Sequence, residues 1–332
     1  MSTAARKLLV VTDMTFPDDA AERRAAAAAD ADYARYDCTG EAETARAVRG
    51  ADVALVNFAP VTDAVLAALA PGATVVRYGI GVDNVDLGAA AARGVRLANV
   101  TDYGSDTVAD HAAAVLLALL RKLPAYHRTI AGGGWGAPSD QAPLRALHAT
   151  TVGLIGTGRI GRALAARLAP FGMTVLGHDP YADPAALARA GIAPVGLDEL
   201  LSRAHAVSLH APATAETHHL IDAETLARLP RGAVLVNTAR GSLVDTGAVV
   251  AALRSGRLGG AGLDVVEDEP LPAASELRSL PNVVLTPHAA FYSEQSVERL
   301  QQLAADEARR ALLGEPLRSP VPLPAAARTN RT

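Results

Sequence analysis

A glycine-rich turn between a short apolar run and a helical pattern constrains this chain more than any other feature. The turn is Gly156-Thr157-Gly158-Arg159-Ile160-Gly161, between the apolar run 151–155 and a predicted helix over 159–170. The first glycine of such a turn allows the tight bend, the second lets the backbone approach a pyrophosphate, and the third lets helix and strand pack closely. The phosphates bind free N–H groups at the helix N-terminus. The pattern therefore predicts a dinucleotide-binding unit.

An acidic residue further along the chain indicates which dinucleotide is bound. Asp179 lies 23 residues after Gly156, at the end of a predicted strand over 174–178. A carboxylate at this place accepts hydrogen bonds from the ribose hydroxyls of NAD, whereas NADP requires a cation for its 2′-phosphate. Because Asp179-Pro180-Tyr181 contains no cation, we expect the cofactor to be NAD.

Strand and helix patterns alternate along almost the whole chain. Short apolar runs that are bounded by Gly, Pro, Asp or Asn and separated by helices are typical of parallel sheets. The predicted strands are 8–12, 51–57, 74–78, 95–99, 151–155, 174–178, 206–210, 233–237, 260–265 and 283–286, and the predicted helices are 20–29, 63–70, 87–93, 106–123 and 159–170. We expect an α/β fold with two Rossmann-like or flavodoxin-like parallel-sheet domains, divided near 99–105 and 287–293.

Composition excludes several other classes of protein. Half of the 332 residues are hydrophobic and 20% are charged, which is enough apolar material for a full core and too much for a disordered chain. A net charge of −4 argues against nucleic-acid binding as the main function. The single cysteine, Cys38, allows neither an intrachain disulfide nor a cysteine-only metal cage. We expect no metal site.

Membrane and export signals are not predicted either. The apolar segment 108–120 is shorter than the ~20 residues of a membrane span and carries charges near both ends. Arg6 and Lys7 are followed by only four apolar residues. A signal peptide needs an apolar stretch of ~7–15 residues. We expect a cytoplasmic protein that does not associate with membranes.

Several segments together resemble the D-2-hydroxyacid dehydrogenases over nearly the full length of the chain. Besides the glycine turn they are Tyr78-Gly79-Ile80-Gly81-Val82-Asp83-Asn84-Val85-Asp86, Leu235-Val236-Asn237-Thr238-Ala239-Arg240-Gly241, Asp264-Val265-Val266-Glu267-Asp268-Glu269-Pro270 and Thr286-Pro287-His288. Within the family, the stretches 218–221 and 288–295 look most like the C-terminal-binding-protein branch, whose animal members are NAD(H)-responsive corepressors. That branch has Trp where this chain has Phe291.

The resemblance implies a domain organisation. The substrate domain is expected from residues 1–101 and 290–332, and the NAD-binding Rossmann domain, over 102–289, is inserted between them. Members of the family are usually dimers joined through their NAD domains, so a homodimer is expected. The helix over 106–123 and the loop 132–136 lie where such contacts form.

The resemblance also assigns the chemistry of hydride transfer between NAD(H) and a small 2-oxo or 2-hydroxy acid. Arg240 is expected to bind the substrate carboxylate and carbonyl, because a guanidinium is a planar fork that stays protonated. His288 is the expected general acid in reduction and the base in oxidation. Glu269 is expected to hydrogen-bond the other ring nitrogen of His288, which keeps the acid charged and orients it.

A glycine loop is expected to complete the substrate site. The backbone N–H groups of Gly79-Ile80-Gly81 are predicted to bind the substrate carboxylate, since glycine allows close approach. Arg77 precedes the loop and either supplies a second cation or forms a salt bridge at the strand edge. Tyr78 and Phe291 are expected either as an apolar wall of the pocket or as core residues.

Further cofactor contacts are carried over from the family. The pyrophosphate is expected on the glycine turn with Arg159 and Ile160, and Asp264 is expected near the nicotinamide carboxamide. The remaining predicted contacts are Thr107, His210, Pro212, Thr217, Thr238 and Ala239. The adjacent His218 and His219 are expected to be solvent-exposed rather than metal ligands.

Three functions remain open at this point. The first is an NAD-dependent D-2-hydroxyacid dehydrogenase that acts on a small anionic 2-oxo acid. The second is an NAD(H)-sensing, corepressor-like binding protein with little turnover. The third is a phosphoglycerate dehydrogenase. The substrate is also open, with glyoxylate, hydroxypyruvate, a branched 2-oxo acid and a phosphono-oxo acid as candidates.

Overall fold

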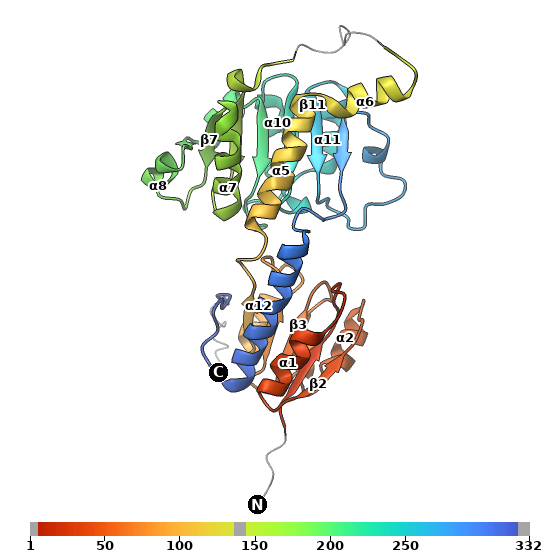
Figure 1. The fold of residues 1–332 in the computed structure, drawn as a ribbon, viewed down its shortest axis with the longest axis vertical. Coiled ribbons are helices and arrows are strands. Elements are labelled where there is room, and N and C mark those ends of the chain that lie inside the picture. The colour runs from red at the N-terminus through yellow and green to blue at the C-terminus, as the bar shows by residue number, and fades with distance from the viewer. Residues whose placement is uncertain (1–5, 136–143, 325–332) are drawn as a thin grey trace, which may run out of the picture. The chain divides into compact units, whose positions relative to one another are not determined.

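The computed structural model describes residues 6–135 and 144–324. The chain forms two compact units, one from the segments up to Gly104 and from Ser293 onwards, the other from Ser105–Tyr292. The second unit is thus inserted into the first (Figure 1). The unit boundaries lie three residues beyond the predicted domain boundaries, so Phe291 belongs to the second unit and not to the first.

The first unit is built on a five-stranded parallel sheet. The strand order is β2-β1-β3-β4-β5, the flavodoxin-like order that reverses between β1 and β3. Its strands are β1 (Leu8–Val11), β2 (Asp32–Arg35), β3 (Val53–Val56), β4 (Thr74–Arg77) and β5 (Arg96–Asn99). All four residues of β3 are buried because helices cover both faces of the sheet.

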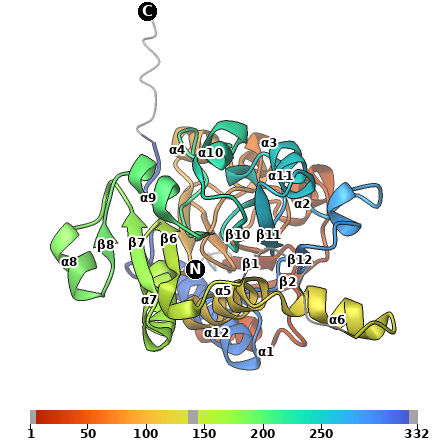
Figure 2. The same ribbon diagram turned by 90° about the horizontal axis from the view of Figure 1, so that it is seen from above.

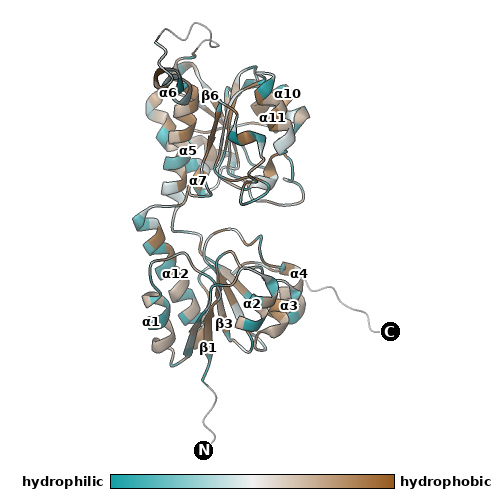
Figure 3. Cartoon of the chain, turned by 90° about the vertical axis from the view of Figure 1, so that its right-hand side faces the viewer, coloured by the Kyte–Doolittle hydropathy of each residue, from teal (hydrophilic) through white to brown (hydrophobic). Residues whose placement is uncertain are grey.

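Five helices surround this sheet within the described part of the unit. One face is covered by α1 (Ala20–Ala28) and α12 (Glu294–Leu313), as Figure 3 shows. The other face carries α2 (Glu41–Ala47), α3 (Asp63–Ala68) and α4 (Leu87–Arg93). The C-terminal segment of the chain therefore completes the core that the N-terminal segment begins.

The second unit is built on a seven-stranded parallel sheet of order β12-β11-β10-β9-β6-β7-β8. This is the Rossmann order with one added strand, and it reverses between β6 and β9. The strands are β6 (Thr151–Ile155), β7 (Thr174–His178), β8 (Ala193–Pro194), β9 (Ala206–Leu209), β10 (Ala233–Asn237), β11 (Leu258–Leu263) and β12 (Val283–Leu285).

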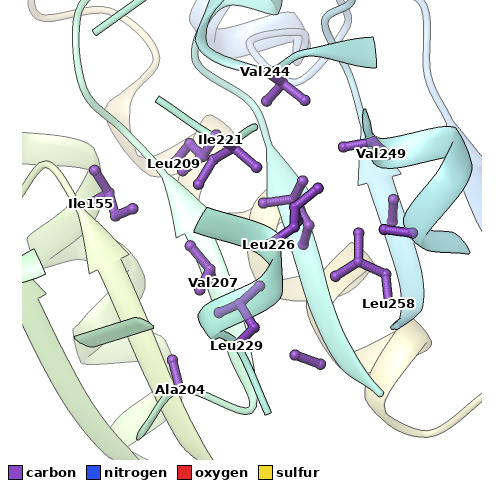
Figure 4. Close-up of a cluster of buried hydrophobic side chains, with 14 of the residues drawn as sticks. Ile155, Ala204, Val207, Leu209, Ile221, Leu226, Leu229, Val244, Val249 and Leu258 are labelled. Atoms are coloured by element: carbon purple, nitrogen blue, oxygen red, sulfur yellow. The ribbon is translucent and has the colours of Figure 1, made fainter. Parts of the chain in front are cut away.

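Helices also cover both faces of the second sheet (Figure 2). One face packs against α5 (Ser105–Leu120) and α7 (Arg159–Leu168). The other packs against α9 (Leu197–Arg203), α10 (Ala223–Arg228) and α11 (Thr246–Arg254), and Figure 4 shows the buried side chains in this layer. Two short helices, α6 (Leu123–Ala131) and α8 (Pro184–Arg189), and the 3-10 turns 147–149, 169–171, 241–243 and 276–278 complete the unit.

The structure contains several elements that were not predicted, among them the helices α2, α9, α10 and α11. The prediction missed β2, an edge strand of sequence Asp-Tyr-Ala-Arg, and α12, which is largely polar and begins at a Ser293 capping box. The predicted helix over 106–123 is too long: α5 ends at Leu120, Lys122 adopts a φ of +54°, and Pro124 then lies in the first turn of α6. Proline cannot continue a helix, because it lacks an N–H group and its ring clashes with the preceding turn.

Two predicted segments are described only in part. The loop 132–136 follows α6 as a turn, and its last residue, Gly136, lies outside the described residues. The last eight residues of the chain lie outside them as well. Among the described residues, no helix is long and apolar enough to cross a membrane, and no three metal-ligating side chains gather in one place.

Candidate active site

The glycine turn joins β6 to α7 at the point where the strand order of the second unit reverses. Gly156 has a φ of +86°, and a Cβ there would lie 2.6 Å from the carbonyl carbon of His210. A Cβ on Gly161 would lie 2.5 Å from the carbonyl oxygen of Gly156, whereas Gly158 faces open space at the start of the helix. These positions leave backbone N–H groups open to a pyrophosphate, so the turn fits a dinucleotide.

Asp179 is oriented toward the same turn. Its Oδ2 accepts hydrogen bonds from the Thr157 N–H at 2.9 Å and the Thr157 hydroxyl at 3.0 Å, and its Oδ1 accepts one from the Tyr181 N–H at 3.1 Å. Burial raises the pKa of this carboxyl, but these hydrogen bonds outweigh it and bring the pKa below its ordinary value. Asp179 is therefore ionised at neutral pH, a charge that suits ribose hydroxyls and opposes a 2′-phosphate.

Other predicted cofactor residues cluster around the turn or follow neighbouring strands. His210 follows β9 and contacts the Ser208 hydroxyl at 2.9 Å, and burial lowers the pKa of its imidazole to about 4. The Thr238 hydroxyl is buried and has no hydrogen-bond partner among the residues that the structure describes. A buried hydroxyl in this state is costly unless a ligand binds it. Thr217 instead donates to the Pro212 carbonyl at 2.7 Å and shapes its own loop.

The remaining predicted contacts differ in exposure. Arg159 and Pro212 are exposed, and the other members of this set are half-buried, namely Thr107, Ile160, Ala239 and Phe291.

His288 and Glu269 form a hydrogen-bonded pair in the second unit. Nδ1 of His288 lies 2.8 Å from Oε2 of Glu269, and Oε1 of Glu269 accepts a hydrogen bond from the Val266 N–H at 3.1 Å. Burial raises the pKa of Glu269, but the pair with His288 and the Val266 bond bring it below its ordinary value. The ionised carboxylate therefore holds the imidazole of His288 through Nδ1 and fixes its orientation.

Asp264 holds the turn that carries His288. Its carboxylate is buried and accepts hydrogen bonds from the Thr286 hydroxyl at 2.5 Å and from the N–H groups of Ala289 and Ala290 at 2.9 Å each. Its backbone carbonyl accepts the His288 N–H at 2.8 Å. The predicted contact with nicotinamide therefore competes with three protein donors, and the role that the structure gives Asp264 is to support His288.

Arg240 follows β10 in a loop that packs against the Glu269 loop. The Asn237 side chain shapes this loop, since it donates to the Arg240 carbonyl at 2.8 Å and accepts from the Ala239 N–H at 3.0 Å. A Cβ on Gly241 would lie 1.9 Å from the Val266 carbonyl oxygen, so the two backbones touch. Asn237 was not among the predicted site residues; it is fully buried and is a polar outlier in an apolar strand.

The glycine loop of the first unit carries its own cation. Gly79 has a φ of +131°, and a Cβ there would lie 1.7 Å from Nη1 of Arg77, so the guanidinium lies directly over the loop. Half-buried Gly81 and exposed Ile80 follow, and the Asn99 side chain donates to the Ile80 carbonyl at 2.6 Å.

The expectation that Tyr78 lines the pocket is not met. The side chain is 1% exposed, lies edge-on to Phe16, and its hydroxyl donates to Glu22 at 2.8 Å. Tyr78 faces the core beneath α1 because side chains alternate across a strand, and Arg77 takes the other direction. The core alternative for this residue is correct.

Comparisons with known proteins give the family. Residues 113–290 match the D-isomer specific 2-hydroxyacid dehydrogenase, NAD binding domain. The chain is 42% identical over 270 residues to D-3-phosphoglycerate dehydrogenase of Mycobacterium tuberculosis, which covers 81% of this chain and 51% of that protein. It is 39% identical over 234 residues to glyoxylate reductase of Korarchaeum cryptofilum, covering 70% of each.

A solved structure agrees. The D-lactate dehydrogenase of Aquifex aeolicus, crystallised with NAD and lactic acid, superimposes with a TM-score of 0.83 at 29% identity, covering 93% of this chain and 96% of that one. The chain spans about half the length of the mycobacterial relatives that it matches. With its Rossmann unit built around the glycine turn and Asp179, this chain belongs to the D-isomer specific 2-hydroxyacid dehydrogenase family.

Proposed function

We propose that this protein is an NAD-dependent dehydrogenase that interconverts a small anionic 2-oxo acid and its D-2-hydroxy acid. The observation that carries the proposal is the pair of His288 and Glu269 at 2.8 Å, beside the loop of Arg240, at the carboxyl edge of a sheet that binds NAD. Relatives named glyoxylate reductase and D-lactate/D-glycerate dehydrogenase support the same reaction class.

Each residue has a role that its geometry suits. NADH, when bound, supplies the hydride to the carbonyl carbon. The Arg240 guanidinium binds the carboxylate and stabilises the negative charge that develops on the carbonyl oxygen. Nε2 of His288 donates a proton to that oxygen, and Glu269 stabilises the protonated ring through Nδ1. In the oxidative direction His288 accepts the hydroxyl proton.

The first unit supports an anionic substrate. The Arg77 guanidinium over Gly79 places positive charge at a loop whose backbone allows close approach. A substrate carboxylate is the simplest ligand for these groups. A phosphonate or phosphate arm suits the same cation, which keeps a phosphoglycerate dehydrogenase as the second candidate. The identity of 42% to the mycobacterial enzyme of that name favours this candidate further.

The test is a panel of 2-oxo acids with NADH, followed by the loss of NADH absorbance. The panel contains glyoxylate, hydroxypyruvate, a branched 2-oxo acid, a phosphono-oxo acid and 3-phosphohydroxypyruvate. Turnover that is lost in H288A supports the proposed reaction, and the preferred substrate separates the two candidates. Tight NADH binding without turnover on any substrate would favour an NAD(H) sensor.

Association into a homodimer through the NAD domains is part of the proposal. No residue of α6 is buried, and Leu123, Ile130 and Trp135 on and after this helix are 56%, 49% and 92% exposed. Large apolar side chains grouped on one element suit burial against a second copy. Sedimentation equilibrium tests this, since Ile130→Glu should shift a dimer toward monomer.

A cytoplasmic location completes the proposal. The only cysteine, Cys38, is buried and unpaired with any other cysteine, as suits a reducing compartment. Cell fractionation tests it directly.

A further inference from the structure

A second histidine–glutamate pair in the Rossmann unit has no role in the proposed reaction. Nε2 of His219 lies 2.6 Å from Oε1 of Glu267, two residues before Glu269. His219 has a φ of +50°, in the left-handed region of the backbone. Side chains other than glycine rarely adopt such a conformation, so specific contacts hold the residue there.

The pair closes a ring of three segments. Oε2 of Glu267 accepts a hydrogen bond from the Thr246 N–H at 2.8 Å, at the start of α11. The backbone N–H of His219 donates to the Ser242 carbonyl at 2.8 Å. Glu267 therefore binds both the His219 segment and the Thr246 segment. These two segments are also joined directly, by the hydrogen bond from His219 to Ser242.

Two of these segments carry the proposed catalytic side chains. The segment 240–246 begins with Arg240, and the loop 264–270 contains Glu269. They touch where Gly241 meets Val266, and the Val266 N–H is also the second donor to Glu269. A displacement of the loop at Glu267 would therefore move the group that orients Glu269.

The electrostatics of Glu267 agree with this arrangement. Burial raises the pKa of this carboxyl, but the hydrogen bonds from Thr246 and His219 outweigh it and lower the pKa below its ordinary value. The carboxylate is thus ionised at neutral pH and binds a helix N-terminus, where the helix dipole favours a negative charge.

We propose that Glu267, held by His219, is a positioning residue that keeps the loop 264–270 in the conformation in which Glu269 orients His288. The proposal rests on the proposed dehydrogenase function and adds two residues to its machinery. Neither of them touches the substrate in this role, because they act through Val266 and Glu269.

The test compares two variants that break the pair in different ways. E267A removes both hydrogen bonds of the carboxylate. H219G removes the ring but introduces the residue that best tolerates a positive φ, so the fold should stay about as stable as the wild type. E224A is the matched control, because Glu224 pairs with Arg228 on α10 in the same unit.

We expect kcat to fall by about 10-fold to 100-fold in E267A and H219G, the loss that a catalytic group misplaced by about 1 Å can cause. The KM for NADH should stay within twofold of the wild type, because the glycine turn is held by its own hydrogen bonds, from the Thr157 N–H to Asp179 and from the Gly156 N–H to the His178 carbonyl. E267Q should retain part of the activity, since its amide keeps one of the two oxygen acceptors of the carboxylate. E224A should match the wild type.

A second measurement decides the proposal independently of turnover. The His288 Nδ1 proton, hydrogen-bonded to a carboxylate, should give a downfield NMR signal that is absent in H288A. We expect this signal to be lost in E267A and H219G and kept in E224A. An unchanged signal in both variants would overturn the proposal, as would equal losses in E224A. If the wild type reduces no 2-oxo acid, the proposed function fails while the signal still tests the positioning role.

Discussion

Replacing Glu269 by Gln tests the proposed mechanism at its centre. The substitution keeps the size and shape of the side chain, and the amide oxygen can still accept the Val266 N–H. It removes the negative charge 2.8 Å from Nδ1 of His288. The protonated ring then loses its counter-charge, and its orientation is no longer held by a charged acceptor.

The size of the effect follows from the geometry. A hydrogen bond to a charged group contributes about 1.5–3 kcal/mol. The side chains of His288 and Glu269 are 31% and 38% exposed, so solvent screens part of the attraction. We therefore take the low part of the range, ~1.5–2 kcal/mol. Each 1.36 kcal/mol is about tenfold in rate, which gives a loss of roughly 10–30-fold in kcat/KM.

Steady-state kinetics with the best 2-oxo acid and NADH measure this loss. Asp268→Asn is the matched control, because it removes a carboxylate from the adjacent residue of the same loop. We expect D268N to stay within twofold of the wild type and NADH affinity to be unchanged in both variants. A kcat/KM within twofold of the wild type in E269Q would refute the assignment of Glu269.

The pH dependence provides a second check on the same variant. The pKa of Glu269 is lowered in the folded protein, so its contribution to stability is fully present above the ordinary unfolded value of about 4.3. It is lost as the pH falls through the lowered folded value. The difference in stability between wild type and E269Q should therefore shrink in acid, as followed by urea unfolding at several pH values.

Further substitutions test the two units separately. Gly156→Ala should weaken NADH binding more than tenfold in calorimetry, because a Cβ would lie 2.6 Å from the His210 carbonyl carbon. Gly158→Ala should leave the free energy of unfolding unchanged, because Gly158 faces open space. Asp179→Ser should narrow the preference for NADH over NADPH at least tenfold in kcat/KM, since the repelling carboxylate is gone. Tyr78→Phe should lower the free energy of unfolding in urea by about 1–3 kcal/mol, because buried Glu22 loses a donor.

The elements that could be predicted from the sequence are those whose environment is uniform. Strands buried on both faces by helices are continuously apolar, and the predicted strands at 151–155, 174–178 and 233–237 agree with the structure to the residue. The edge strand β2 has no such signal, because one side of it faces solvent. Helix α12 was missed since its apolar positions form only a narrow stripe between charged residues.

The candidate site shows the same division. The glycines of the site can be recognised in the sequence, because no other residue fits where two backbone segments approach each other closely, as at Gly156. Tyr78 could not be placed, because a residue at the end of a strand faces either the core or the ligand edge and only packing decides which. Asn237 and Glu267 act through hydrogen bonds to backbone groups distant in the chain, and a sequence carries no direct record of such partners.

The sequence by itself determined the α/β class, the nucleotide-binding turn and the identity of the family, because these depend on local patterns of glycine, charge and apolar residues. Tertiary structure decided the rest. It brought Oε2 of Glu269 to 2.8 Å from Nδ1 of His288, although 19 positions separate them in the chain. It also directed the Tyr78 side chain toward the core. It also tied His219 to Glu267 across 48 residues. Contacts of this kind form only when the sheet aligns the ends of its strands, since parallel strands bring distant loops to one edge.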